Sequence, residues 1–447
     1  MDKLLHSVYL DKDKCLGCTT CLRSCPTGAI RVREAKAKII ESKCIDCGEC
    51  IRICPHHAKL ARTDEFSEIE KYKYKVAIPA PTLLGQFKLK YSIEAILSAL
   101  KSIGFDEVVE VAFGAELVGR AIKYEFTAKH YPKPMISSAC PAVSKLIQVR
   151  FPELTNSISR LKAPMALTAR VTRKRLIEME NMKNEDIGIF FITPCAAKAT
   201  DVSNPLPTDD LFATINGSIS IKDIYAPLLT AIKNVEIQKN IHHSTPDGFS
   251  WAVSGGESQY LKNKRVLHVD GISNVIKVLE EIECGKLDNI DFFEGLACIG
   301  GCVGGCLTVE NNFVAKMYIE ERAKAERMES SRHLDEAYIK NLYNSGMMHQ
   351  KEKIFPRTPK PLDDNVHKAI EKMHKIEELE AKLPGLDCGS CGAPGCRALA
   401  EDIITGKAKE IDCVFVLKDR VLELSNLTSE LLQVGHPMKK NNENEEE

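Results

Sequence analysis

Cysteines are the residues in this chain whose number and grouping most clearly allow chemistry. The sequence holds 18 of them in three stretches, Cys15–Cys54, Cys140–Cys306 and Cys388–Cys413. A cysteine thiolate binds soft metals through its sulfur, and iron–sulfur clusters are held in this way. Disulfides are rare in a reducing compartment, so we expect these cysteines to bind metal.

The first stretch contains the motif Cys-x-x-Cys-x-x-Cys-x-x-x-Cys-Pro twice, and equivalent positions lie 29 residues apart. In this bacterial ferredoxin spacing, three neighbouring cysteines bind one 4Fe–4S cluster and the fourth binds the other cluster. One ligand set is therefore Cys15, Cys18, Cys21 and Cys54. The other is Cys44, Cys47, Cys50 and Cys25. Two zinc sites are the alternative, although zinc spacings normally group cysteines in twos. Adjacent clusters carry single electrons, which implies a redox site elsewhere in the chain.

The middle stretch has three motifs in which cysteine follows an apolar run, namely Ser137–Pro141, Thr193–Lys198 and Glu294–Cys306. If each run is a buried strand, the cysteines lie at carboxyl ends of parallel strands, where α/β proteins place their ligands. Glycines such as Gly300 and Gly304 let the backbone approach a bulky group. The spacing predicts a four-thiolate iron–sulfur site with a spare cysteine, and several unrelated buried cysteines are the alternative.

The last stretch fits a further cluster site. Its cysteines are Cys388, Cys391, Cys396 and Cys413. The glycines around them free backbone N–H groups to face the sulfur atoms of a cube, and a zinc site is the alternative. Residues 382–415 resemble a small 4Fe–4S domain found in several electron-transfer and corrinoid proteins. Cys284 and Cys306 are left without an expected metal.

Alternating apolar runs and amphipathic segments predict the elements that position these cysteines. The predicted strands are Val76–Pro79, Val108–Ala112, Pro134–Ser137, Ile187–Thr193, Arg265–Val269 and Phe292–Ala297. The predicted helices are Ile93–Ile103, Ala142–Arg150, Asn274–Glu283 and charged segments at 315–350, 364–382 and 417–433. Strands interleaved with helices indicate an α/β domain with mainly parallel sheets.

The three central motifs, in this order, resemble those of the iron–iron hydrogenases, and the ferredoxin-like run before them also matches that family. The resemblance covers about Lys75–Glu310. It implies a two-lobed α/β catalytic-type domain, an N-terminal α+β ferredoxin-like domain and a small helical C-terminal 4Fe–4S domain. The implied cofactor is an H-cluster, a 4Fe–4S cube bridged to a di-iron unit with CO, cyanide and a dithiolate. The implied reaction is the reversible conversion of H2 into protons and electrons, with three accessory 4Fe–4S clusters as relays.

The resemblance also assigns residues to this cofactor. By position, the cube ligands are Cys140, Cys195, Cys298 and Cys302. Cys302 is also the bridge to the di-iron unit, and Lys198 is placed to donate a hydrogen bond to a cyanide. Asp201 stands where the family usually has a glutamate. Further cofactor-binding residues are Ala80, Pro81, Thr82 and Ser138.

The proton relay departs from the catalytic members of the family. These have two adjacent cysteines in the first motif, and the first one passes protons to the di-iron unit. Here that position is Ala139, which cannot carry a proton, whereas proton transfer needs a donor within hydrogen-bond reach. Glu125 and Ser159 loosely match outer relay positions, and a second relay glutamate corresponds to Ile122. The pattern resembles the sensory-type branch of the family and implies slow turnover.

Two other functions stay open. Cytosolic iron–sulfur assembly factors resemble the same domain, lack the relay cysteine and carry no di-iron unit. The double ferredoxin run and the C-terminal module argue against that function, because such factors have a reduced N-terminal set. A plain electron-transfer protein without gas chemistry is the third candidate.

The expected domains are a two-cluster ferredoxin-like domain at 1–65, a hydrogenase-like domain at 75–350, a helical linker at 360–382, a 4Fe–4S domain at 383–415, and a helix with a disordered tail at 416–447. A net charge of −1 gives no electrostatic footprint for nucleic acid. Without a signal segment or an apolar run long enough for a membrane span, we expect a cytoplasmic protein. Expected partners are H2, protons and a ferredoxin-like or other redox or signalling protein, and a homodimer is a further candidate.

Overall fold

The computed structural model describes residues 6–127, 131–204, 212, 214–329, 334–357 and 361–433. The chain forms two compact units, each made of two separate stretches. The larger unit comprises Met1–Lys14 and Ile40–Pro359, and the smaller comprises Cys15–Ile39 and Lys360–Glu447. The tail expected to be disordered, Lys439–Glu447, lies outside the described residues.

Two parallel sheets form the centre of the larger unit. Their strand orders are β6-β5-β8-β9 and β10-β11-β7. The bounds are β5 Tyr74–Pro79, β6 Glu107–Val108, β7 Met135–Ile136, β8 Ile187–Thr193, β9 Gly217–Ser220, β10 Val266–Asp270 and β11 Phe292–Leu296. All seven residues of β8 are buried, as expected for a parallel strand covered on both faces.

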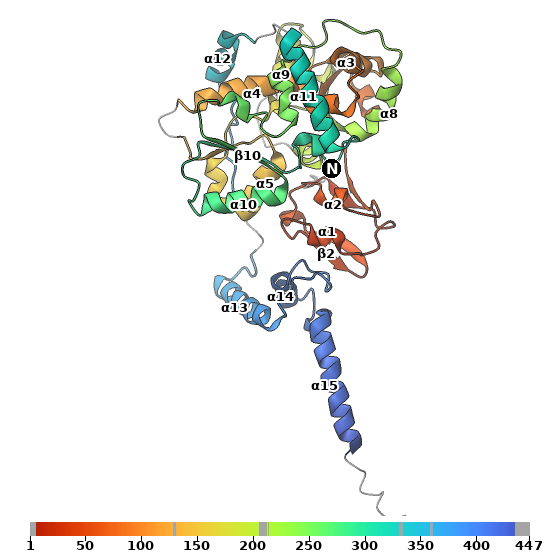
Figure 1. Ribbon diagram of the computed structural model, residues 1–447, viewed down its shortest axis with the longest axis vertical. Helices are drawn as coiled ribbons and strands as arrows, with labels where there is room; N and C mark the ends of the chain where they lie inside the picture. Colours follow the sequence, from red (N-terminus) through yellow and green to blue (C-terminus); the bar gives the residue numbers. More distant parts are fainter. Residues whose placement is uncertain are drawn as a thin grey trace, which may run out of the picture. The chain divides into compact units, whose positions relative to one another are not determined.

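Helices cover these sheets and connect their strands (Figure 1). In the larger unit they are α2 Glu49–Arg52, α3 Ile93–Ser102, α4 Val111–Glu125, α5 Pro141–Arg150, α6 Pro164–Glu178, α7 Ala196–Ser203, α8 Ile221–Ala231, α9 Pro246–Phe249, α10 Ile272–Glu283, α11 Asn312–Glu329 and α12 Glu336–Asn344. Two 3-10 turns matter for the site, η3 Pro81–Gln86 and η9 Cys302–Gly304. Ser92 caps α3 by accepting a hydrogen bond from the Ala95 N–H, and proline begins α5, both favoured helix starts.

The predicted strand at Val108–Ala112 is wrong beyond its first residue. The strand β6 ends at Val108, and α4 already begins at Val111. Periodicity cannot separate a short buried strand from the start of a buried helix, and here the apolar pattern continues at helical spacing through Leu117 and Ile122. The other predicted strands are confirmed to within two residues, whereas β9 was not predicted.

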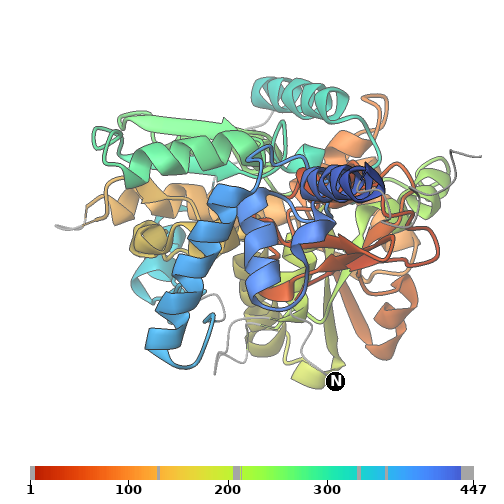
Figure 2. The ribbon, with the colours of Figure 1, turned by 90° about the horizontal axis from the view of Figure 1, so that it is seen from below.

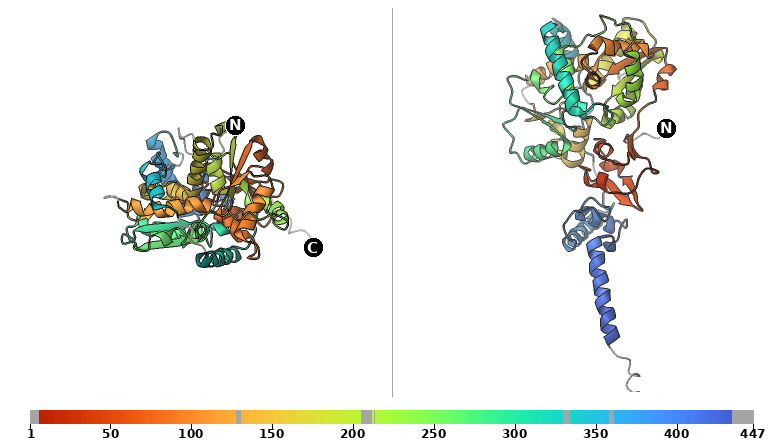
Figure 3. Two further views of the ribbon diagram at one scale, coloured as in Figure 1. Left: turned by 90° about the horizontal axis from the view of Figure 1, so that it is seen from above. Right: turned by 45° about the vertical axis from the view of Figure 1, so that its right-hand side comes forward.

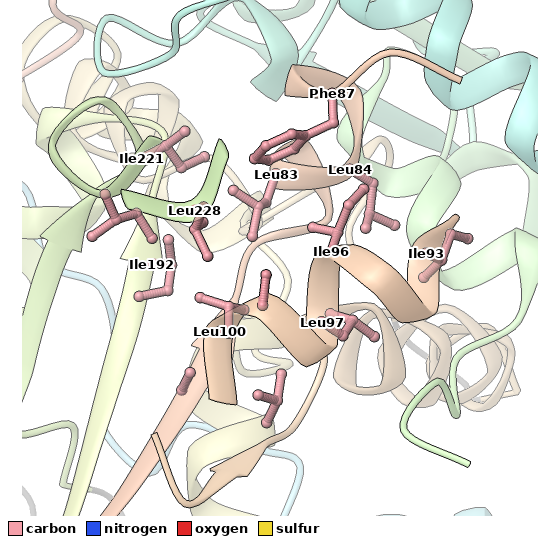
Figure 4. Packing of buried hydrophobic residues seen from close by; sticks show 14 of the residues in the cluster. Leu83, Leu84, Phe87, Ile93, Ile96, Leu97, Leu100, Ile192, Ile221 and Leu228 are labelled. Atoms are coloured by element: carbon pink, nitrogen blue, oxygen red, sulfur yellow. The ribbon is translucent and has the colours of Figure 1, made fainter. Parts of the chain in front are cut away.

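The loop after β5 is held by the largest core of the larger unit. Leu83 and Phe87, which follow Thr82, pack near Ile96 of α3 and Ile192 of β8 (Figure 4). Burial of one such side chain stabilises the fold by about 1.5–3 kcal/mol. This core therefore fixes the start of η3, where the first cofactor loop is expected.

The first cysteine run, Cys15–Cys25, and the second, Cys44–Cys54, have the same local structure. Each run has a one-turn helix, α1 Thr20–Arg23 in the first run and α2 in the second. The last cysteine of each run accepts a hydrogen bond from a backbone N–H four residues later. Ala29 donates to Cys25 at 3.2 Å, and Ala58 donates to Cys54 at 3.3 Å. In the larger unit, β1 Val8–Leu10 and β4 Lys59–Ala61 pair antiparallel next to the second run.

The smaller unit contains the first cysteine run, the antiparallel hairpin that follows it at Ile30–Ile39, and the C-terminal module. Its further elements are β2 Ile30–Arg33, β3 Lys36–Ile39, α13 Val366–Lys382, α14 Cys396–Ile404 and α15 Val414–Gln433. Helices α13 and α14 lie side by side (Figure 2). Buried Asp402 of α14 accepts hydrogen bonds from Arg31 at 2.7 Å and Arg33 at 2.9 Å. Among the residues described, every helix is too short or too polar to cross a bilayer.

Candidate iron–sulfur and hydrogen-binding centre

The three central motifs come together because each follows a strand of the two parallel sheets. Cys140 precedes α5, Cys195 follows β8, and Cys298 follows β11. A Cβ added at Gly305 would lie 2.2 Å from the Pro194 carbonyl oxygen, so only glycine permits this approach. The second and third motifs are therefore in direct backbone contact.

The central thiols share one electrostatic environment. Loss of hydration on burial raises the pKa of Cys140, Cys195 and Cys298, to about 12 for Cys298, and the neighbouring cysteines raise it further. Burial also raises the pKa of Cys306, which belongs to the same group. Because metal ligation requires the thiolate, a bound cluster would supply the positive charge that these sulfur atoms need.

Two cations already face this group. The Lys198 Nζ lies 3.8 Å from the Cys302 Sγ. Burial alone would lower the pKa of the Lys198 ammonium, but the surrounding cysteines outweigh it and raise the pKa. Arg52 of α2 donates to the Cys298 Sγ at 3.5 Å and to the Gly304 carbonyl at 3.3 Å. Lys198 therefore stays charged beside the expected bridging cysteine.

The second cysteine run is attached to the central site. A Cβ added at Gly48, between two cysteines of that run, would lie 2.5 Å from the Cys306 Sγ. Buried Lys145 of α5 pairs with Asp46 at 3.2 Å and with Asp201 of α7 at 3.5 Å. These contacts bring the second run, α5 and α7 together. A cluster in this run would therefore adjoin a cluster held by the central motifs.

The surroundings of Cys302 fit the H-cluster that the motifs imply. The hydroxyls of Thr82 and Ser254 are buried and have no hydrogen-bond partner among the residues described. A buried polar group without a partner costs about 1–3 kcal/mol, so a ligand that accepts hydrogen bonds is expected there. The turn η3, which carries Thr82, contacts η9, and the Ser254 N–H donates to Gly300 at 3.3 Å. CO and cyanide groups of a di-iron unit are acceptors of the required kind.

The other predicted cofactor residues occupy defined places. Ala80 is buried at the end of β5, and Pro81 begins η3. Ser138 donates to the Leu161 carbonyl at 2.9 Å, so its hydroxyl is already engaged within the protein.

The outer residues of the expected proton route are separated. Glu125 accepts hydrogen bonds from the Tyr343 hydroxyl at 2.8 Å and from His349 at 2.9 Å. Burial would raise the pKa of Glu125, but these hydrogen bonds outweigh it and lower the pKa. Ser159 is buried, and its hydroxyl accepts a backbone N–H. Among the described residues no hydrogen bond joins Glu125 to Ser159, and Ile122 of the same helix is fully buried.

A buried pair of carboxyl groups lies next to the first motif. The Ser137 hydroxyl donates to Glu257 at 2.5 Å and accepts from the Ala139 N–H at 3.1 Å. Burial, together with the charge of nearby Glu294, raises the pKa of Glu257 to about 8. The Ser258 hydroxyl donates to Glu294 at 2.5 Å. At neutral pH Glu257 therefore holds a proton within two hydrogen bonds of Ala139.

This pair was not predicted from the sequence. Glu294 opens the third motif, but Glu257 lies in a separate glycine-rich segment, and only the fold brings the two together. Exposed His268 of β10 is the register partner of Glu294 of β11. A single glutamate in a sequence carries no signal for such a pair.

The C-terminal cysteines surround one small core. Cys391, Cys396 and Cys413 pack with apolar side chains of α13 and α14, whereas Cys388 is exposed. Hydrogen bonds from Ser390 lower the pKa of the Cys388 thiol. The module therefore offers both buried and exposed thiols to a cluster.

The ferredoxin-like cysteines divide between the two units. Cys15, Cys18, Cys21 and Cys25 belong to the smaller unit, and Cys44, Cys47, Cys50 and Cys54 belong to the larger one. The assignment of Cys54 to the cluster of the first run, and of Cys25 to the cluster of the second run, stays a prediction. No disulfide joins any two of the 18 cysteines, all of which lie within the residues that the structure describes.

Family comparisons agree with this arrangement. A profile described as the iron-only hydrogenase large subunit, C-terminal domain, matches residues 73–265 and 257–306, which together span just over half of the 447 residues. Profiles of a 4Fe-4S dicluster domain and of a putative Fe-S cluster match residues 7–55 and 383–415.

Individual relatives are distant. Iron hydrogenase 1 of Clostridium pasteurianum is 23% identical over 375 residues, which cover 68% of this chain and 65% of the relative, so this chain spans slightly less than two thirds of its length. A probable cytosolic Fe-S cluster assembly factor of Drosophila erecta is 19% identical over 375 residues, covering 68% of this chain and 73% of the factor. A solved [FeFe]-hydrogenase structure matches with a TM-score of 0.50 and 16% identity, covering 64% of this chain and 95% of that chain, which supports the hydrogenase-like α/β fold. With its central domain matched over more than half of its length, the chain belongs to the iron-only hydrogenase family and is an iron–sulfur protein.

Proposed function

We propose that this chain is a sensory-type iron–iron hydrogenase, which binds H2 and converts it slowly and reversibly into protons and electrons at an H-cluster. The observation that carries the proposal is the group around Cys302. The charged Lys198 lies 3.8 Å from its sulfur, and the buried hydroxyls of Thr82 and Ser254 lack partners among the described residues. When bound, the di-iron unit supplies the metal site at which H2 is split.

The chain's own residues would hold this cofactor. The cube ligands are Cys140, Cys195, Cys298 and Cys302. The Lys198 ammonium would donate to a cyanide, and a fixed positive charge next to anionic ligands is strongly favourable where water is excluded. The hydroxyls of Thr82 and Ser254 would donate to the remaining ligands. These contacts are absent from a site that holds only a cube.

Ala139 makes the proton supply differ from that of a fast hydrogenase. Because alanine cannot carry a proton, the proton must come from another group near the first motif. Glu257 is the group that fits best, since it is protonated at neutral pH and hydrogen-bonded to Ser137. The remaining step beyond Ser137 lacks a fixed donor, and this gap accounts for slow turnover.

Electrons would leave through the second cysteine run, which touches the central thiols through Gly48 and Arg52. Ferredoxin spacing makes the first run the next relay. The C-terminal module is bound to the hairpin of that first run by Asp402, which pairs with Arg31 and Arg33. The cluster of the C-terminal module would therefore end the series of relays and deliver electrons to a redox or signalling partner.

An iron–sulfur assembly factor is the second candidate, favoured by Ala139 and by the relative from Drosophila erecta. Such a protein would hold a cube at the central cysteines without a di-iron unit. Such a site would not require the charged Lys198 beside Cys302, nor the buried hydroxyls of Thr82 and Ser254 that lack partners among the described residues.

Gas exchange tests the proposal. When the fully loaded protein is placed under D2 in ordinary water, the splitting of D2 should release HD, which mass spectrometry detects even at slow turnover. Lys198→Ala should lose most of this exchange while retaining the accessory clusters. Absence of HD from wild-type protein that carries the complete cofactor would contradict the proposal.

A further inference from the structure

The last helix of the smaller unit is rich in apolar residues, and among the described residues of that unit no element covers it. Helix α15, Val414–Gln433, has no buried residue and extends from the C-terminal module as a single helix (Figures 1 and 3). Its exposed large apolar residues are Val414, Phe415, Leu417, Val421, Leu422, Leu424, Leu427, Leu431 and Leu432. A helix of this kind normally buries its apolar face against a partner.

The apolar residues follow a heptad spacing. Positions alternate by three and four residues through Val414, Leu417, Val421, Leu424, Thr428 and Leu431. In heptad terms the β-branched residues Val414, Val421 and Thr428 occupy position a, and leucines occupy position d. This combination favours a parallel pair of helices over higher oligomers.

We propose that α15 pairs with α15 of a second copy of this chain as a parallel, in-register coiled coil. The flanking positions support this choice of partner. In a parallel pair, position g of one helix faces position e of the next heptad in the other helix. Leu427 at g then meets Leu432 of the other copy, and Arg420 meets Ser425. An antiparallel pair would instead bring Leu427 against Arg420.

The available area agrees with a reversible dimer. Exposed fractions run from 45% for Val414 and Leu417 to 73% for Leu431 and 81% for Leu432. The seam positions of this 20-residue helix are fewer than the roughly 20–30 residues per side of a standard interface, which buries about 800 Å² per partner. The helix is about 30 Å long, so the pair would be reversible and concentration-dependent.

The position of α15 gives the dimer a consequence for electron transfer. The helix begins directly after Cys413, the last cysteine of the C-terminal module. Paired helices lie about 8–10 Å apart, so the two C-terminal modules would adjoin at the start of the coiled coil. The dimer itself does not depend on the proposed hydrogenase function.

Sedimentation of the full-length, cluster-loaded protein tests the dimer. Wild-type protein should show a concentration-dependent dimer, and Leu424→Glu at position d should raise the dimer dissociation constant at least about tenfold, because two charges would face each other in an apolar seam. Leu422→Glu is the matched control, since Leu422 is 52% exposed on the same helix but outside the seam. A wild-type monomer at the highest soluble concentration, or equal effects of the two variants, would overturn the proposal.

A second pair of variants tests the orientation. Leu427→Lys and Leu432→Glu should each weaken the dimer, and the double variant should restore it, because the new charges meet across a parallel seam. Additive weakening in the double variant would contradict the parallel, in-register arrangement.

Discussion

Two glutamates of the hydrogenase-like domain have surroundings that shift the pKa of the side chain in opposite directions. Glu125 accepts hydrogen bonds from Tyr343 and His349, and they lower its pKa. Glu257 is buried beside Glu294, and this environment raises its pKa to about 8. At neutral pH the first carboxyl group is ionised, whereas the second carries a proton.

The comparison shows that sequence position alone does not identify a proton donor. Glu125 was predicted as a loose match to an outer relay position, yet its hydrogen bonds stabilise the anion. Glu257 was not predicted as a relay residue, yet its environment keeps the proton that a general acid needs at working pH. The proposed proton supply therefore rests on Glu257 and its partner Glu294, whose pKa values are both raised.

The largest expected effect is that of Glu257→Gln. The amide keeps the size and the hydrogen bond to Ser137 but cannot release a proton. General acid–base groups contribute at least about 100-fold to rate, so HD formation should fall by about that factor. An unchanged rate, with iron content equal to that of wild type, would remove Glu257 from the proton route.

A smaller gain is expected from Ala139→Cys, which restores a thiol at the relay position. The rate should rise about tenfold, equivalent to about 1.4 kcal/mol of barrier. In the double variant Ala139→Cys with Glu257→Gln, the tenfold gain should be lost if the thiol receives its proton from Glu257. It should persist only if the thiol receives its proton by the route through Glu125. A fast wild-type enzyme would show that no relay thiol is needed.

The pH dependence separates the two carboxyl groups. Because the protonated form of Glu257 is the donor, exchange should be constant at neutral pH and fall above about pH 8, at most about tenfold per pH unit. Glu257→Gln should flatten this decline. A decline that survives in the variant would assign the titration to another group.

The smallest effect is expected from Glu125→Gln. Because Glu125 is held as an anion by Tyr343 and His349, it supplies no proton at neutral pH. The exchange rate should change by less than about threefold, well below the effect of a general acid. A loss as large as that of Glu257→Gln would reverse the comparison.

The sequence predicted the elements that follow strong local patterns. Cysteine spacing predicted that the three central motifs meet at the ends of parallel strands. The apolar runs predicted β8 without error in its bounds. The sequence could not predict α4 from its first residues, because a short apolar run fits both a strand and a helix. It could not predict the Glu257–Glu294 pair either, because the raised pKa depends on burial and on a neighbour brought close by the fold.

Infrared spectroscopy of the fully loaded protein tests most directly whether the chain holds a di-iron unit beside Cys302 and Lys198. We expect sharp CO and cyanide stretching bands in wild-type protein, and their loss in Cys302→Ser. Iron analysis should give about 16 iron atoms for the four cubes after reconstitution without the di-iron unit. Absence of the bands from protein that has all four cubes and has been exposed to the maturation enzymes would contradict a hydrogenase and favour an assembly or electron-transfer protein.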